Sequence, residues 1–149
     1  MGSSPVTHHN APARNPVPEG KTRICVAGCK VCDHAGRARR LADFIARKYP
    51  NEYETWFYFD SAKFFDYFNY ETFGKVPFPE HLKGHSTSPF CWLEKGNNNI
   101  DPIGGRSHLA EWAEKTFPND KDIIECAKSS WTFGDVFHAF GSEIQPTAK

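Results

Sequence analysis

The strongest constraint on the fold is a pair of short apolar runs that flank one amphipathic segment. The first run, TRICVAG at 22–28, ends at a glycine and predicts a buried strand. The second, YETWFYF at 53–59, is rich in aromatic residues and predicts another strand. Between them, residues 33–50 place apolar side chains at helical spacing, with Asp33 as the expected N-cap and Pro50 as the stop. This order predicts two parallel strands joined by a right-handed crossover.

The rest of the chain adds a hairpin and more helices. Residues 89–94 and 100–103 predict two paired strands, because the KGNNN between them is turn-forming. Residues 75–86 predict a loop. Further helices are predicted over 61–74, 104–118 and 120–131. The sequence therefore predicts an α/β sandwich with the order β-α-β-α-β-β-α and a small mixed sheet.

Composition divides the chain into three expected parts. Residues 1–20 form a polar, proline-rich arm without periodicity, residues 21–118 a folded domain, and residues 119–149 an extra helix with an aromatic tail. The arm is too polar to fold alone. Because ordering costs about 1–2 kcal/mol per residue, we expect a partner to hold it.

Charge and hydropathy argue against several classes of protein. The formal net charge is zero, so the sequence shows no bias toward nucleic acid or an anionic membrane, and we expect neither as a partner. No apolar run approaches the roughly 20 residues that span a bilayer, and residues 1–20 lack the apolar core of a secretory signal. Without such a signal, the five cysteines are expected to be reduced thiols in the cytoplasm. They are Cys25, Cys29, Cys32, Cys91 and Cys126.

The segment TSPFCWLEKGNNNIDPIGGRSHL at 87–109 carries the most specific signature. It resembles the glutaredoxin branch of the thioredoxin fold, whose members carry Thr-x-Pro with a cis proline, a strand, a turn, an isoleucine and a glycine pair that leads into a helix. The matching residues, in order, are Thr87, Ser88, Pro89, Ile103, Gly104 and Gly105. The resemblance covers about residues 22–117 and implies a thioredoxin/glutaredoxin-like sandwich with a cis peptide bond before Pro89.

The same resemblance assigns positions to the cysteines. An ungapped alignment places Cys32 where the family has its nucleophile, Ala35 where it has the resolving cysteine, and Cys29 where it has a lysine. The other register takes the C-x-x-C at 29–32 as the active motif and requires a shorter first strand and loop. We favour the ungapped register, in which Ala35 rules out dithiol exchange within the motif.

The chemistry expected of Cys32 is mixed. A thiol attacks as thiolate, and a helix N-terminus and nearby cations such as Arg37 and Arg39 favour that form. The adjacent Asp33 disfavours it. We therefore expect a redox-degenerate site, with two alternatives: glutathione-dependent thiol-disulfide exchange at Cys32, or a redox sensor that pairs Cys32 with Cys29.

Ligand binding is expected to be weak. The resemblance implies a glutathione groove at Thr87, Ser88, Pro89, Gly104, Gly105, Arg106 and Ser107. Family members often carry an acidic residue after the glycine pair, which this chain lacks. The cysteine pair and His34 make only half of a typical zinc site. We expect no metal and no cofactor, with glutathione only under the alternative function.

A second resemblance concerns the setting. Residues 26–28 (VAG), residues 41–44 (LADF) and the Ser88, Pro89 and Trp92 group are similar to the glutaredoxin-like N-terminal domain of divergent, cilia-associated malate dehydrogenase paralogues. This likeness implies a structural or binding module in a larger assembly, with the ciliary axoneme as the first candidate.

The two ends of the chain are the expected contacts in such an assembly. The arm at 1–20 and the segment at 131–149 would contact tubulin and axonemal proteins in a doublet microtubule. The second segment is unusually apolar for a tail, with Trp131, Phe133, Phe137 and Phe140.

Overall fold

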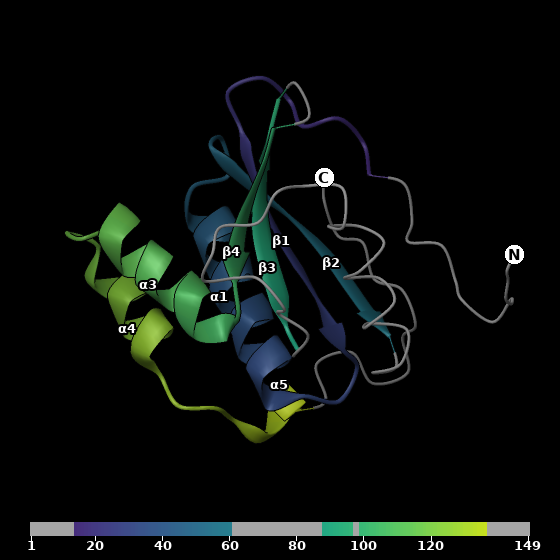
Figure 1. The fold of residues 1–149 in the computed structure, drawn as a ribbon. Coiled ribbons are helices and arrows are strands. Elements are labelled where there is room, and N and C mark those ends of the chain that lie inside the picture. The colour runs from purple at the N-terminus through teal and green to yellow at the C-terminus, as the bar shows by residue number, and fades with distance from the viewer. Residues whose placement is uncertain (1–13, 61–87, 97–98, 137–149) are drawn as a thin grey trace, which may run out of the picture.

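In the computed structural model, a four-stranded mixed sheet carries helices on one face (Figure 1). The structure describes residues 14–60, 88–96 and 99–136. The strands are β1 (Thr22–Cys29), β2 (Tyr53–Asp60), β3 (Phe90–Lys95) and β4 (Asn99–Gly104). They lie in the order β2-β1-β3-β4, with β1 parallel to β2 and antiparallel to β3, and β3 antiparallel to β4. The predicted α/β class, parallel pair and hairpin pairing are confirmed. The helix predicted at 61–74 and the loop at 75–86 lie outside the described residues.

The described helices gather around α1. They are α1 (Asp33–Lys48), α3 (Arg106–Thr116), α4 (Lys121–Lys128) and α5 (Phe133–Val136). Figure 1 shows α1 and α3 against the sheet, α4 beside α3, and α5 at the beginning of α1. Helix α4 begins where the Asp120 carboxylate accepts from the Ile123 N–H. The helix predicted over 120–131 is shorter than expected, because α4 ends at Lys128 and a separate one-turn helix, α5, follows.

The main core lies between the sheet and the helices. Alternate residues of the strands point to this side and pack against the apolar stripe of α1. Its central members are Ile24, Val26, Ala35, Ala38, Leu41, Ala42, Ile45, Phe57, Phe59, Cys91, Leu93 and Leu109. The small residues of the helix allow it to lie close to β1 and β2. This packing fixes where α1 begins, and therefore where Cys32 lies.

The opposite face of the sheet is also buried, but it carries charge. Three cross-strand rows run across β2, β1 and β3: Glu54–Arg23–Glu94, Trp56–Cys25–Trp92 and Tyr58–Ala27–Phe90. All nine side chains are buried. Arg23 lies between two carboxylates, with its Nε 2.7 Å from Glu54 Oε2 and its Nη1 3.2 Å from Glu94 Oε1. Both faces of the central strands are therefore inside the molecule, as the dense aromatic residues of β2 suggest.

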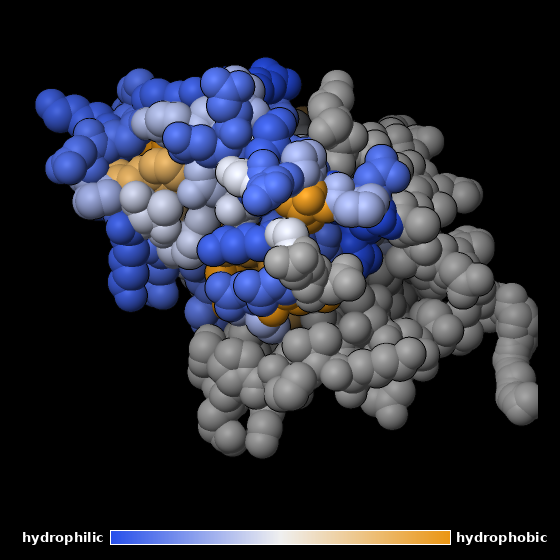
Figure 2. Space-filling view, turned by 90° about the horizontal axis from the view of Figure 1, so that it is seen from above, coloured by the Kyte–Doolittle hydropathy of each residue, from blue (hydrophilic) through white to orange (hydrophobic). Residues whose placement is uncertain are grey.

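The outer surface is polar over much of its extent. Figure 2 shows one face on which the described residues are mostly hydrophilic, with apolar residues confined to small areas. Three large apolar side chains among the described residues are well exposed: Val31, Trp131 and Phe133. Within the part of the chain that the structure describes, no helix has the length and apolar character needed to cross a bilayer.

Candidate thiol site

Cys32 lies at the N-terminus of α1, at the position that the ungapped register assigns to the nucleophile. It is the N-cap residue, with extended backbone (φ −166°, ψ 117°), and its carbonyl accepts from the Gly36 N–H at 3.0 Å. The expectation that Asp33 caps the helix is wrong, because the chain is still extended at Cys32 and Asp33 is already in the first turn. Cys29 is the last residue of β1. Only Cys32 of this pair therefore occupies the helix end.

Ser88 lies beside the two cysteines. The Ser88 hydroxyl oxygen accepts from the Cys29 N–H at 2.9 Å, and the same hydroxyl donates to Cys32 Sγ at 3.5 Å. The peptide bond between Ser88 and Pro89 is cis, as expected. Gly28 allows this approach, because a Cβ there would lie 2.6 Å from Ser88 Oγ. Thr87 lies outside the described residues.

No second thiol follows Cys32 within its motif. Ala35 occupies that position and is fully buried in the core. None of the five cysteines forms a disulfide. Burial raises the pKa of the Cys25 and Cys91 thiols well above the ordinary range, which makes both poor nucleophiles. Thiol chemistry at this end of the sheet therefore depends on Cys32, with Cys29 as its nearest sequence partner.

The glycine pair shapes the start of α3. Gly104 is buried and has a positive φ of 126°, which favours glycine, and Gly105 is the N-cap, with its N–H donating to His108 Nδ1 at 3.0 Å. Ser107 is exposed in the first turn.

Two guanidinium groups approach each other between the starts of α1 and α3. Burial and the Arg37 charge lower the pKa of Arg106, while Asp33 acts in the opposite direction. The Nε atoms of Arg37 and Arg106 are buried and have no hydrogen-bond partner among the described residues. Two adjacent cations with unused donors suit a carboxylate or another small anion.

The C-terminal segment closes the beginning of α1, which the sequence did not predict. The Cys32 N–H donates to the Val136 carbonyl at 3.1 Å. Gly36 lies so close to α5 that a Cβ would fall 1.9 Å from the Asp135 carbonyl oxygen. Arg40 makes a two-pronged ion pair with Asp135, at 3.1 and 2.8 Å. The amide of the N-cap residue is therefore bonded to the backbone of α5.

Residues 129–132 strengthen this closure. Arg37 Nη2 donates to the Ser129 carbonyl at 2.7 Å, and Arg40 Nη1 donates to the Ser129 hydroxyl at 2.8 Å. The Thr132 N–H donates to Asp135 Oδ2 at 2.7 Å. We call residues 129–136 the strap. One sequence signal for it is Gly36, since a glycine inside a helix costs stability and often marks a close approach of another backbone.

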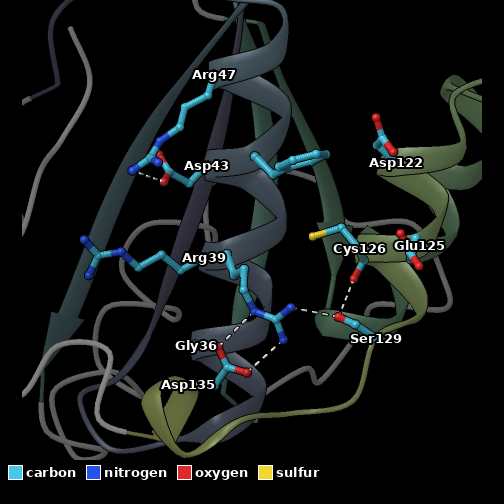
Figure 3. A pocket seen from close by; sticks show the side chains of 11 residues that line it. Gly36, Arg39, Asp43, Arg47, Asp122, Glu125, Cys126, Ser129 and Asp135 are labelled. Carbon is cyan, nitrogen blue, oxygen red and sulfur yellow. Dashed lines mark hydrogen bonds and ion pairs between the residues drawn. The ribbon is translucent and has the colours of Figure 1, made fainter.

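A cavity of about 770 Å³ lies between α1, α4 and the strap, and Cys32 is not part of its lining (Figure 3). Its walls carry both signs of charge, with Arg39 and Arg47 from α1 and Glu125 from α4, and Cys126 is part of its lining. Burial raises the pKa of the Cys126 thiol. The arginines and carboxylates of this cavity offset one another, so it has no clear preference for an anion or a cation.

Within residues 14–60, 88–96 and 99–136, no three His, Cys, Asp or Glu side chains gather in a way that could hold a metal ion. No protein-family model matches the sequence, and a comparison with curated proteins finds no match.

Proposed function

We propose that this chain is a redox-degenerate glutaredoxin-like domain that acts as a structural and binding module in a larger assembly. The sheet order, with a parallel β1–β2 pair and a β3–β4 hairpin, is compatible with the thioredoxin fold. Cys32 at the mouth of α1 and Ser88–Pro89 beside it lie as the glutaredoxin resemblance implies. This agreement supports the glutaredoxin branch of the thioredoxin fold. Ala35 in place of a second thiol supports the loss of redox activity.

The closed beginning of α1 is the observation that carries the proposal. A thiol-disulfide oxidoreductase needs access for a disulfide at the helix N-terminus, where the amide groups stabilise the thiolate. Here the Cys32 N–H is bonded to Val136, and the buried Ala35 cannot resolve a mixed disulfide. The strap packs directly against the first turn of α1, beside Cys32. The domain is thus better suited to holding a shape than to turnover.

One observation favours a second function, glutathione-dependent exchange at Cys32. The Ser88 hydroxyl donates to Cys32 Sγ, which stabilises a thiolate. Arg37 and Arg106 offer unused donors for a carboxylate of glutathione. This candidate, a cytoplasmic oxidoreductase, differs from the first in requiring the strap to move. A redox sensor would instead form a disulfide between Cys32 and Cys29, and that disulfide would be its readout.

The redox test measures reduction of a glutathione mixed disulfide, with glutathione reductase and NADPH as the coupled detection. The structural module predicts turnover far below that of an ordinary glutaredoxin and no further loss in Cys32→Ser. Cys126→Ser is a matched control, because it also removes a partly buried thiol but lies away from Cys32. Glutaredoxin-like turnover that Cys32→Ser abolishes and Cys126→Ser retains would establish the enzyme instead. Equal loss in Cys29→Ser would indicate that the pair acts together.

For the assembly, we propose the ciliary axoneme, with tubulin and axonemal proteins as partners through residues 1–20 and 131–149. The exposed rings of Trp131 and Phe133 on the anchored strap support a contact there. Two tethered contacts bind together more strongly than either alone.

Truncations that spare the described contacts test this placement. Removing residues 1–13 leaves Arg14 in place, and removing 137–149 leaves α5 in place. Each shortened chain is expected to keep its thermal stability but to be released from axonemes at lower salt than the full chain. If both remain bound as tightly as the full chain, residues 1–13 and 137–149 are not the anchors, and the contact must lie on the residues that remain, such as Trp131 and Phe133.

A further inference from the structure

On the sheet face opposite α1, the guanidinium of Arg14 packs against Trp56, Trp92 and Glu94. We call these three side chains, together with Arg23 and Glu54, the recess. The Arg14 guanidinium carbon lies 5.2 Å from the ring centroid of Trp56 and 5.7 Å from that of Trp92. Arg14 Nε lies 2.5 Å from Glu94 Oε2. The Arg23 Nη1 donates to the Asn15 carbonyl at 2.6 Å. The segment that we expected to need a partner is therefore held at Arg14 and Asn15 by the sheet of its own chain.

Charge explains why the recess needs a cation. Its floor is the row Glu54–Arg23–Glu94, in which two carboxylates flank one guanidinium. The side chains are only 4%, 2% and 7% exposed, respectively. A buried charge without a partner is costly. Arg14 supplies the second positive charge and makes the group of four neutral.

The shape and donors of the recess select a guanidinium over an ammonium. Two indole rings lie within cation–π range of the planar group, an arrangement that suits arginine better than a compact, strongly hydrated lysine. The Trp92 indole N–H donates to Glu94 Oε2 at 2.9 Å, which fixes the carboxylate that meets Arg14. The recess is therefore held in shape by the sheet itself, and its geometry favours arginine.

The next residues show contacts of the kind made with an extended peptide. Arg23 reaches the backbone of Asn15 rather than its side chain. Pro16 and Pro18 follow, and proline favours an extended path at low entropic cost. The segment returns to β1 through a turn in which the Lys21 N–H donates to the Pro18 carbonyl at 3.1 Å, with Gly20 at φ 85°. Recognition thus uses one side chain and one carbonyl.

We propose that this recess is a peptide-binding site for an arginine in an extended, proline-flanked segment, with Arg14 as its built-in occupant. A partner protein that presents an arginine in this form can replace Arg14. The short connection between Arg14 and β1 gives the built-in occupant an effective concentration in the millimolar range, so the isolated chain keeps its own arginine bound. This inference goes beyond the proposed function and does not depend on the chemistry of Cys32.

The test uses the full chain carrying Arg14→Ala, which empties the recess. The probe is an acetylated and amidated peptide with the sequence of residues 11–19, APARNPVPE. Tryptophan fluorescence and the melting temperature report binding, since two indoles line the recess. We expect saturable binding to Arg14→Ala and a raised melting temperature. The unmodified chain should bind the same peptide only at millimolar concentration, where the peptide competes with Arg14 for the recess. Peptides with lysine or citrulline in place of the arginine should bind about tenfold more weakly or worse, because a charged contact is lost or misplaced.

A control variant and a refolding measurement complete the test. The double variant Arg14→Ala/Glu94→Gln removes the carboxylate that meets the guanidinium, so it should lose binding of the arginine peptide. If Arg14→Ala does not fold alone, recovery of the folded state on adding the arginine peptide supports the site. Failure of that recovery, absence of saturable binding to the folded variant, or equal binding of the citrulline peptide would overturn the proposal.

Discussion

Gly36→Ala should separate the strap from α1, although the same change normally stabilises a helix. Alanine in place of a helical glycine is worth about 0.5–1 kcal/mol. At this position the new Cβ would lie 1.9 Å from the Asp135 carbonyl oxygen, with two more backbone atoms of Asp135 within 2.8 Å. These are backbone atoms of a packed turn, so they cannot rotate away. The strap must shift as a whole.

The loss follows from the contacts that hold the strap. The hydrogen bond from Cys32 to Val136 contributes about 0.5–1.5 kcal/mol, and the ion pair between Arg40 and Asp135 about 1–2 kcal/mol after allowance for the partial exposure of Arg40. After the gain in helix propensity is subtracted, we expect a net destabilisation of about 1–2 kcal/mol. With a urea dependence of about 2 kcal/mol per molar, in the middle of the range for small proteins, the unfolding midpoint should fall by roughly 0.5–1 M.

Urea unfolding followed by far-UV circular dichroism measures this change, and maleimide labelling followed by peptide mass spectrometry reports the access of reagent to Cys32. Gly134→Ala is the matched control, because the nearest atom to its new Cβ is Thr132 Oγ1 at 3.8 Å. That variant should keep the original stability and labelling rate. Gly36→Ala should label faster at Cys32. If Gly36→Ala proved as stable as Gly134→Ala or more so, α5 would not rest on Gly36 and the closure would be refuted.

Two other perturbations test the packing around the site. Hydrogen bonds from Lys48 and Tyr49 lower the pKa of Asp120 from 3.8 to about 2, so its contribution to stability is present above pH 3.8 and is lost as the pH falls toward 2. In Asp120→Asn, the urea midpoint should therefore change less with pH between 3.8 and 2 than it does in the unmodified chain. An unchanged pH dependence would contradict this role. Gly28→Ala places a Cβ 2.6 Å from Ser88 Oγ and should cost about 1–3 kcal/mol, measured by the same unfolding assay; unaltered stability would show that Ser88 has room to move.

Local sequence pattern was enough to predict the elements of the sheet and the first helix. Residues 22–28 and 53–59 are apolar or aromatic on both sides, as strands buried on both faces must be, and β1 and β2 form within one residue of these limits. The apolar residues at helical spacing in 33–50 predicted the helix, and they are the residues that α1 buries in the core. The ungapped register was preferred because the alternative requires a shorter first strand and loop; in the structure β1 extends to Cys29 and Cys32 is the N-cap of α1.

The strap and the arginine recess could not be predicted in the same way, because both depend on distant pairs. Helix α5 has only one turn, and its ion pair joins Asp135 to Arg40, 95 residues away. Arg14 likewise meets Glu94 across the sheet. Short polar segments give no periodic signal, and the choice of partner follows from the three-dimensional arrangement of the strands.

The row of charges on β2, β1 and β3 also restricts how this sequence can evolve. Neutralising Arg23 alone would leave the buried Glu54 without its ion-pair partner, and neutralising either carboxylate would upset the balance that Arg14 completes. Single charge-removing substitutions at the three buried positions are therefore costly, whereas paired replacements by apolar residues of similar volume cost less. We therefore expect related sequences either to keep all four charged residues or to have lost them together. Where they are lost, the N-terminal segment should no longer be held on the sheet.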